Sequence, residues 1–107
     1  MQFQRVAVAA VEYLLPDERV RSDELERRLA PLYERLRLRE GRLELMTGIV
    51  ERRFFPPATR PSEVAARAGR AALAARGVDV ERIGLLIHAS VCRDFLEPAT
   101  ASVVHHT

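Results

Sequence analysis

The sequence predicts an α/β protein on the basis of two adjoining segments. Ile83–Ala89 is an almost continuous apolar run, which is typical of a strand that is covered on both faces. The segment before it, from Pro61 to about Arg76, is rich in alanine, opens with proline and is followed by Gly77, as many helices are. A helix that leads into a buried strand predicts a β-α-β unit with a right-handed crossover.

Two further strands and a broken helix are expected earlier in the chain. Phe3–Leu15 is rich in valine and alanine and alternates imperfectly, which favours a partly buried strand. Ile49–Phe55 predicts a second, short strand that prolines terminate. Between them, Ser22 is the expected N-cap of a helix, and Pro31 is expected to split or kink that helix.

Length and composition indicate one globular domain at most. The 107 residues are 48% apolar and 30% charged, and the net charge is only +2. Arginines and acids alternate along the chain and form no block of one sign. Nucleic-acid binders usually gather basic residues on one face, so a nucleic-acid-associated domain is the weakest functional hypothesis.

Cysteine usage and hydropathy favour a cytoplasmic protein. A single cysteine excludes an internal disulfide framework and suits a reducing compartment. The apolar N-terminus is interrupted by Glu12 and makes a poor signal peptide, and no apolar run is long enough to span a bilayer. No metal or cofactor is expected either, because His88, His105 and His106 match no zinc spacing and there is no glycine-rich phosphate loop.

The loop Ser90–Glu97 is the candidate site, because ligands of open α/β sheets bind beyond the carboxyl ends of the strands. Glu97 precedes Pro98, where a helix is expected to begin, and the helix dipole would favour its charged form. From the residues alone, a solvated acid beside a helix is the more common role. Cys92 is expected to be a small, partly buried residue rather than a nucleophile.

Several short motifs run in order through the chain and point to one family. They are Ser22-Asp23-Glu24-Leu25-Glu26, Thr47-Gly48-Ile49, Glu51-Arg52-Arg53, Ile83-Gly84-Leu85 and Ser90-Val91-Cys92-Arg93-Asp94-Phe95-Leu96-Glu97-Pro98. Together they resemble the thiolase superfamily, and within it the ketoacyl-ACP synthase III group. The last motif resembles the olefin-forming branch, whose members condense two long acyl thioesters head to head.

This resemblance implies a fold, a reaction and a set of residues. The fold would be thiolase-like, a mixed sheet covered by helices, with residues 1–107 as an incomplete N-terminal domain. The reaction would be a Claisen condensation of acyl-CoA or acyl carrier protein thioesters in fatty acid or olefin biosynthesis, without a cofactor. Glu97 would act as the base in the partner subunit of a homodimer, and Phe95 and Leu96 would line the acyl pocket. Many synthases of this group carry an apolar residue at the place of Glu97.

The family's nucleophilic cysteine would lie beyond Thr107, so the chain alone is expected to be inactive. The alternative is a non-catalytic thiolase-like subunit or interaction module that completes a partner chain. Arg52, Arg53 and Arg60 have two open roles. They would meet coenzyme A phosphates or the acidic face of a carrier protein, or they would form a solvated edge.

Overall fold

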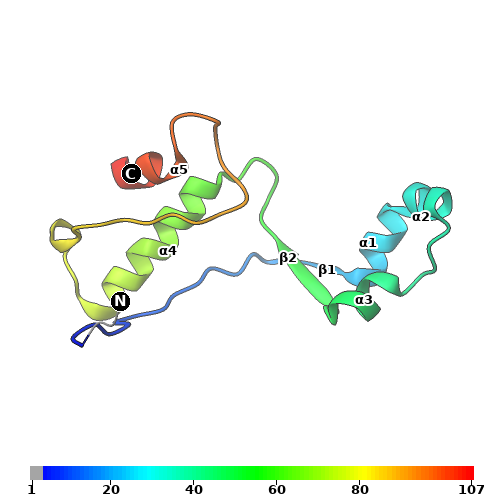
Figure 1. The fold of residues 1–107 in the computed structure, drawn as a ribbon, viewed down its shortest axis with the longest axis horizontal. Coiled ribbons are helices and arrows are strands. Elements are labelled where there is room, and N and C mark those ends of the chain that lie inside the picture. Colours follow the sequence, from blue (N-terminus) through cyan, green and yellow to red (C-terminus); the bar gives the residue numbers. More distant parts are fainter. Residues whose placement is uncertain (1–3) are drawn as a thin grey trace. The chain divides into compact units, whose positions relative to one another are not determined.

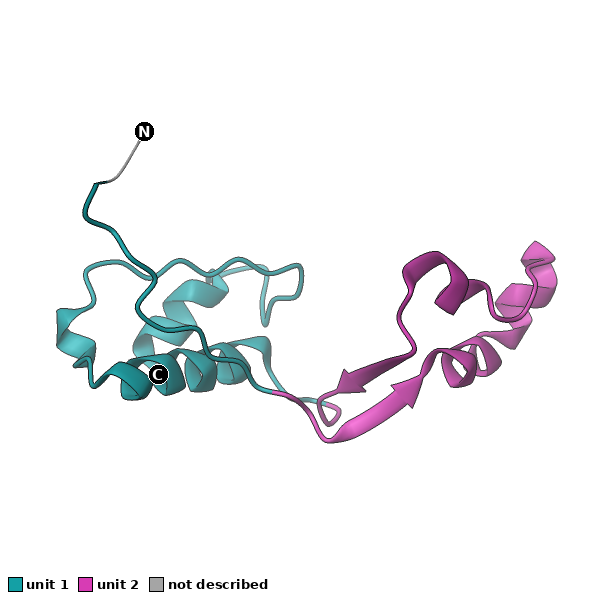
Figure 2. Ribbon diagram, turned by 90° about the horizontal axis from the view of Figure 1, so that it is seen from below, with its two compact units in different colours: residues 1–14, 58–107 teal, residues 15–57 magenta. Residues whose placement is uncertain are grey.

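The computed structural model describes residues 4–107, and it divides the chain into two compact units. Unit 1 contains residues 1–14 and 58–107, and unit 2 contains residues 15–57 (Figure 2). The elements follow one another in the order β1 (Glu18–Arg21), α1 (Ser22–Arg28), α2 (Ala30–Leu36), α3 (Arg42–Thr47), β2 (Glu51–Phe54), α4 (Pro61–Arg76), η1 (Val80–Arg82) and α5 (Thr100–His106) (Figure 1).

Unit 2 is built on an antiparallel pair of strands, β1 and β2. Val20 of β1 lies opposite Arg52 of β2 and is 1% exposed, so it is the buried apolar side chain of this pair. β2 confirms the short strand predicted over 49–55. β1 was not predicted, because three of its four residues are charged and only Val20 signals a buried face.

Helices α1, α2 and α3 complete unit 2. α1 carries Asp23 and Glu24 in its first turn and arginines in its last, so its charges oppose the helix dipole at both ends. The predicted break at Pro31 is confirmed: α1 ends before Leu29, and Pro31 lies in the first turn of α2, where its missing N–H costs nothing. The predicted N-cap was wrong. Arg21 occupies the cap position, and Ser22 lies inside the helix with its hydroxyl bonded elsewhere.

Unit 1 is built on α4, which confirms the helix predicted from Pro61 to Arg76. Gly77 follows it with a φ of 59°, a left-handed conformation that ends a helix at little cost only for glycine. Asp79 then caps η1, since its Oδ1 accepts a hydrogen bond from the N–H of Glu81 at 3.2 Å. α5 packs against α4.

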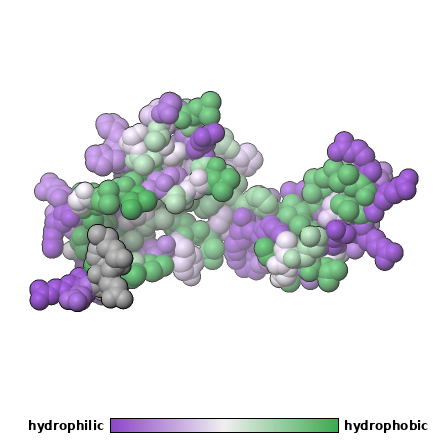
Figure 3. All heavy atoms as spheres, in the orientation of Figure 1, coloured by the Kyte–Doolittle hydropathy of each residue, from purple (hydrophilic) through white to green (hydrophobic). Residues whose placement is uncertain are grey.

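The two apolar runs of unit 1 form no strands among the described residues. Residues 4–14 and Ile83–Ala89 have extended or irregular backbone without sheet pairing, which corrects two predicted strands and the β-α-β unit; Phe3 lies outside the described residues. Val8 and Ile87 are 82% and 81% exposed, and apolar side chains cover much of the face in Figure 3. Valine-rich composition favours a strand only where a neighbour pairs with its backbone and covers its face.

A hollow of about 850 Å³ lies on unit 1, lined by α4, the segment after η1 and the end of α5. Leu73, Val78, Leu86 and Val104 contribute to its mostly apolar wall. Within residues 4–107, no helix is both long and apolar enough to cross a membrane.

Candidate functional site

The predicted site segment, residues 90–97, connects the extended run after η1 to α5. It contains no helix or strand, so contacts with the rest of unit 1 must hold it in place. Two of these contacts go to the first residues of α4 and the residue before that helix. The beginning of α4 is therefore the platform on which the candidate site is built.

Asp94 makes the strongest of these contacts. Its Oδ1 accepts a hydrogen bond from the N–H of Ser62 at 3.1 Å, and its Oδ2 accepts one from the Ser62 hydroxyl. Ser62 is 3% exposed, so the contact is sheltered from water on the helix side. These hydrogen bonds, first that of the Ser62 hydroxyl and then that of its N–H, hold the pKa of Asp94 below its ordinary value. The positive charge of Arg60 acts in the same direction.

Phe95 and Leu96, the predicted acyl-pocket residues, have different surroundings. The guanidinium carbon of Arg60 lies 5.9 Å from the centroid of the Phe95 ring, within the range of a cation–π contact. Phe95 is 47% exposed and Leu96 is 77% exposed, so a large part of both side chains is free to meet an acyl chain or another polypeptide.

Glu97, the predicted base, is exposed and makes no hydrogen bond or ion pair with any part of the described chain. Its predicted place at a helix start was wrong, because α5 begins at Thr100 rather than at Pro98. The dipole of α5 therefore acts at Thr100, whose side-chain oxygen is buried without a hydrogen-bond partner within residues 4–107. Because Glu97 has no such bonds, its position is set by the backbone of the segment 90–97.

Of the other sequence candidates, His88 lies near Asp94, and its positive charge helps to lower the pKa of that carboxylate. Cys92 is a free thiol and is exposed, which corrects its expected partial burial. Its backbone N–H donates to the hydroxyl of Ser90 at 3.1 Å. His88 is half-buried. No group of three or more histidine, cysteine or acidic side chains that would bind a metal ion occurs in the described part of the chain.

The arginines of β2 bond within their own unit. Nη1 of Arg52 donates to the hydroxyl of Ser22 at 2.8 Å, and Nη1 of Arg53 donates to the carbonyl of Pro16 at 2.9 Å. Both side chains are half-buried. These contacts give both arginines a structural role in addition to the two roles left open above, because they connect β2 to the rest of unit 2.

A buried carboxylate that the sequence did not single out organises unit 2. Glu26 is 5% exposed, and its two oxygens accept hydrogen bonds from the N–H groups of Leu43 and Gly41, both at 2.6 Å, and from the Tyr33 hydroxyl at 2.9 Å. The Leu43 N–H, followed by the Gly41 N–H and the Tyr33 hydroxyl, holds the pKa of Glu26 below its ordinary value. The only sequence signal was its place in the Ser22–Glu26 motif.

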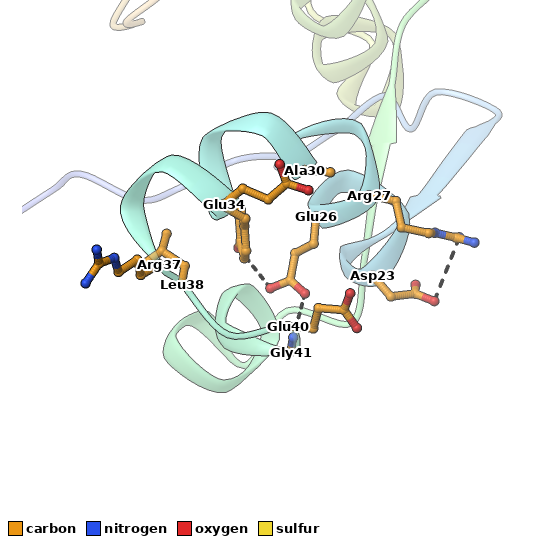
Figure 4. A pocket seen from close by; sticks show the side chains of 10 residues that line it. Asp23, Glu26, Arg27, Ala30, Glu34, Arg37, Leu38, Glu40 and Gly41 are labelled. Atoms are coloured by element: carbon orange, nitrogen blue, oxygen red, sulfur yellow. Dashed lines mark hydrogen bonds and ion pairs between the residues drawn. The ribbon is translucent and has the colours of Figure 1, made fainter.

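Glu26 also lines a hollow of about 540 Å³ on unit 2. Figure 4 shows its side chain directed toward Gly41, with Asp23 and Arg27 at one side and Arg37 at the other. Because Glu26 is fully hydrogen-bonded within the unit, its role in this hollow is to fix the loop before α3.

Comparison with known proteins places this geometry in a family. The chain is 44% identical over 101 residues to acyl-CoA:acyl-CoA alkyltransferase of Shewanella oneidensis, which is 94% of this chain and 29% of that protein. It is 44% identical over 103 residues to a 3-oxopimeloyl-[acyl-carrier-protein] synthase of Rhodothermus marinus, which is 96% of this chain and 28% of that protein. No family model matches the chain.

A solved structure agrees in fold as well as in sequence. The crystal structure of 3-oxoacyl-(acyl carrier protein) synthase III from Xanthomonas oryzae superposes with a TM-score of 0.86 at 39% identity, covering 99% of this chain and 31% of that one. The chain therefore spans less than a third of each of these relatives. The predicted thiolase-like α/β fold is confirmed, and the chain belongs to the thiolase superfamily, in the group of ketoacyl-ACP synthase III and acyl-CoA:acyl-CoA alkyltransferase.

Proposed function

We propose that this chain is part of an acyltransferase that joins two acyl thioesters by Claisen condensation. The observation that carries the proposal is the 44% identity to an acyl-CoA:acyl-CoA alkyltransferase over 94% of the chain, together with the synthase III fold. The substrates would be acyl-CoA or acyl carrier protein thioesters in fatty acid or long-chain olefin biosynthesis. The protein would work in the cytoplasm as a homodimer, without a cofactor.

Glu97 is the proposed base. Its carboxylate removes a proton from the carbon next to the carbonyl of one thioester, and the resulting enolate attacks the acyl group held on a cysteine. A carbon–carbon bond forms, the carbon–sulfur bond to the cysteine breaks, and the electron pair leaves with the thiolate. The exposure of Glu97 and its freedom from contacts within the described chain support this role, because a base must reach its substrate.

The nucleophilic cysteine is proposed to lie outside these 107 residues. Cys92, the single cysteine, is exposed, and its nearest described hydrogen-bonding partner is Ser90 rather than a base. Residues 1–107 by themselves would therefore not condense thioesters.

The test is Glu97→Gln in the complete protein. The exchange keeps the size of the side chain and removes the proton acceptor, so condensation should fall by about 10²- to 10⁴-fold, while transfer of the first acyl group to the cysteine continues. Glu81→Gln is the matched control, since Glu81 is an exposed acid of the same unit. Condensation at an unchanged rate in the Glu97 variant would refute the assignment.

A mixing experiment tests whether Glu97 serves the partner subunit. One inactive protein carries Glu97→Gln, and a second carries Glu97 but lacks the nucleophilic cysteine. If Glu97 acts across the dimer, random mixing should restore about a quarter of the wild-type activity, because half the dimers are mixed and each has one complete site. If Glu97 acts within its own subunit, mixing restores nothing.

The second candidate is a non-catalytic subunit that completes the fold of a partner chain. The exposed apolar runs favour it, since Val8 and Ile87 need a covering surface that the described residues do not provide. Sequencing the source gene through codon 107 separates the two hypotheses. A frame that continues to a cysteine supports the enzyme, and a stop codon supports the subunit.

A further inference from the structure

The first turn of α4 lacks a local cap. Arg60 occupies the N-cap position and makes no side-chain hydrogen bond there, and Pro61 has no N–H to donate. The first free donor of the helix is therefore the N–H of Ser62, and Asp94 accepts from it at 3.1 Å. A residue 32 positions away thus supplies the cap that the adjacent sequence does not.

Phe95, the residue after Asp94, provides a second contact between the segment 90–97 and the start of α4. Phe95 lies under the guanidinium of Arg60, at 5.9 Å from ring centroid to guanidinium carbon. Arg60 and Ser62 thus bind Phe95 and Asp94 respectively. The carboxylate also meets the positive end of a 16-residue helix and the charge of Arg60, and both favour its ionised form.

We propose that Asp94 is a positioning residue: by binding Ser62, it fixes the segment that carries Glu97 at the start of α4. This inference rests on the proposed function, in which Glu97 is the base. Glu97 makes no hydrogen bond or ion pair among the described residues, and Leu96 beside it is 77% exposed. Glu97 is therefore held through its neighbours in the chain: Asp94 and Phe95 fix the side before it, and α5, which packs against α4 from Thr100 onward, fixes the side after it.

The length of the segment makes the anchor important. Only Phe95 and Leu96 lie between Asp94 and Glu97, so a fixed Asp94 keeps the backbone of Glu97 within about 10 Å of it, and release of Asp94 removes this limit. A displacement of about 1 Å at a reacting group is enough to slow a reaction about 100-fold. Loss of the Asp94 contact should therefore affect the step that uses Glu97 and spare the step that does not.

The experiment compares two half-reactions in the complete protein carrying Asp94→Ala. Condensation should fall by about 10- to 100-fold, while acylation of the nucleophilic cysteine should stay within about twofold of wild type. Asp79→Ala is the matched control, because Asp79 also caps a helical turn of unit 1 but lies at η1. If both half-reactions fall by the same factor, Asp94 has only a structural role and the inference is overturned.

A milder variant guards against misfolding. Ser62→Ala removes one of the two hydrogen bonds to Asp94 and keeps the other, which comes from the backbone. It should lower condensation by a smaller factor than Asp94→Ala and again spare acylation. A Ser62 variant with wild-type condensation, beside a strongly impaired Asp94 variant, would overturn the pairing of these two residues.

Combining Asp94→Ala with Glu97→Gln separates the inference from the proposed function. If Asp94 acts through Glu97, its loss should cause no further decrease once Glu97 is gone. Losses that multiply overturn the positioning role and leave Glu97 as the base. Full condensation by Glu97→Gln alone overturns the proposed function, and the inference with it.

Discussion

Replacing Ser22 with alanine should loosen the strand pair of unit 2. The Ser22 side chain is 1% exposed, donates to the carbonyl of Ile49, and accepts from Nη1 of Arg52 at 2.8 Å. The backbone N–H of Ser22 also donates to the carbonyl of Val50 at 2.9 Å. Ser22 thus joins the start of α1 to the segment that enters β2, and Ser22→Ala removes the two side-chain bonds while keeping the backbone one.

The expected loss follows from these two bonds. The neutral bond to Ile49 contributes about 1 kcal/mol, and the bond from a charged donor contributes about 1.5–3 kcal/mol. Arg52 is half-buried and regains water when Ser22 is gone, so the lower end applies to its bond. Ser22→Ala should therefore cost about 2–3 kcal/mol, or about a 30- to 150-fold increase in local opening.

Hydrogen exchange measured residue by residue is the assay. Amides of β1 and β2 should exchange faster in Ser22→Ala by the stated factor, while amides of α4 in unit 1 should not change. Ser102→Ala is the control, because that exposed hydroxyl donates only to the carbonyl of Ala99 near its own helix. Strand amides that exchange within about threefold of the wild-type rate in Ser22→Ala would refute the reasoning.

Two further predictions concern glycine and pH. Gly77→Ala should destabilise α4 by about 1 kcal/mol, because φ is 59° at that position. Gly69→Ala, in the middle of the same helix, should stabilise it by up to about 1 kcal/mol, since an added Cβ meets nothing within 4 Å. Thermal unfolding followed by circular dichroism measures both changes, and shifts of the same sign would contradict the argument. The hydrogen bond from Leu43 lowers the pKa of Glu26 below 4.5, so the stability that Glu26 adds is complete above pH 4.5 and is lost as the pH falls through the lowered value. Glu26→Gln should flatten this acid-side dependence in hydrogen exchange of unit 2, and an unchanged pH profile would contradict it.

Local sequence signals predicted the helices well. Pro61 at the start and Gly77 beyond the end bounded α4, and Pro31 separated α1 from α2. These residues act through their own backbone geometry, since proline lacks an N–H and glycine adopts a positive φ, so their effect is independent of distant contacts. The motif order likewise identified the family correctly.

Strands and side-chain contacts depended on residues far apart in the chain. The valine-rich run at 4–14 and the apolar run Ile83–Ala89 pair with no strand among the described residues, while the charged β1 pairs with β2. A strand exists only when a second strand satisfies its backbone, and composition does not say which segment will be adjacent.

The sequence by itself determined the family, the positions of the main helices, and the segment 90–97 as the candidate site. Only the tertiary structure showed that Asp94 binds Ser62, that Arg60 covers Phe95, and that Glu26 holds the loop at Gly41. Helix limits follow from neighbouring residues, whereas each of these contacts joins residues 15 or more positions apart. Their formation depends on how the chain folds back on itself, which residue-by-residue propensities do not contain.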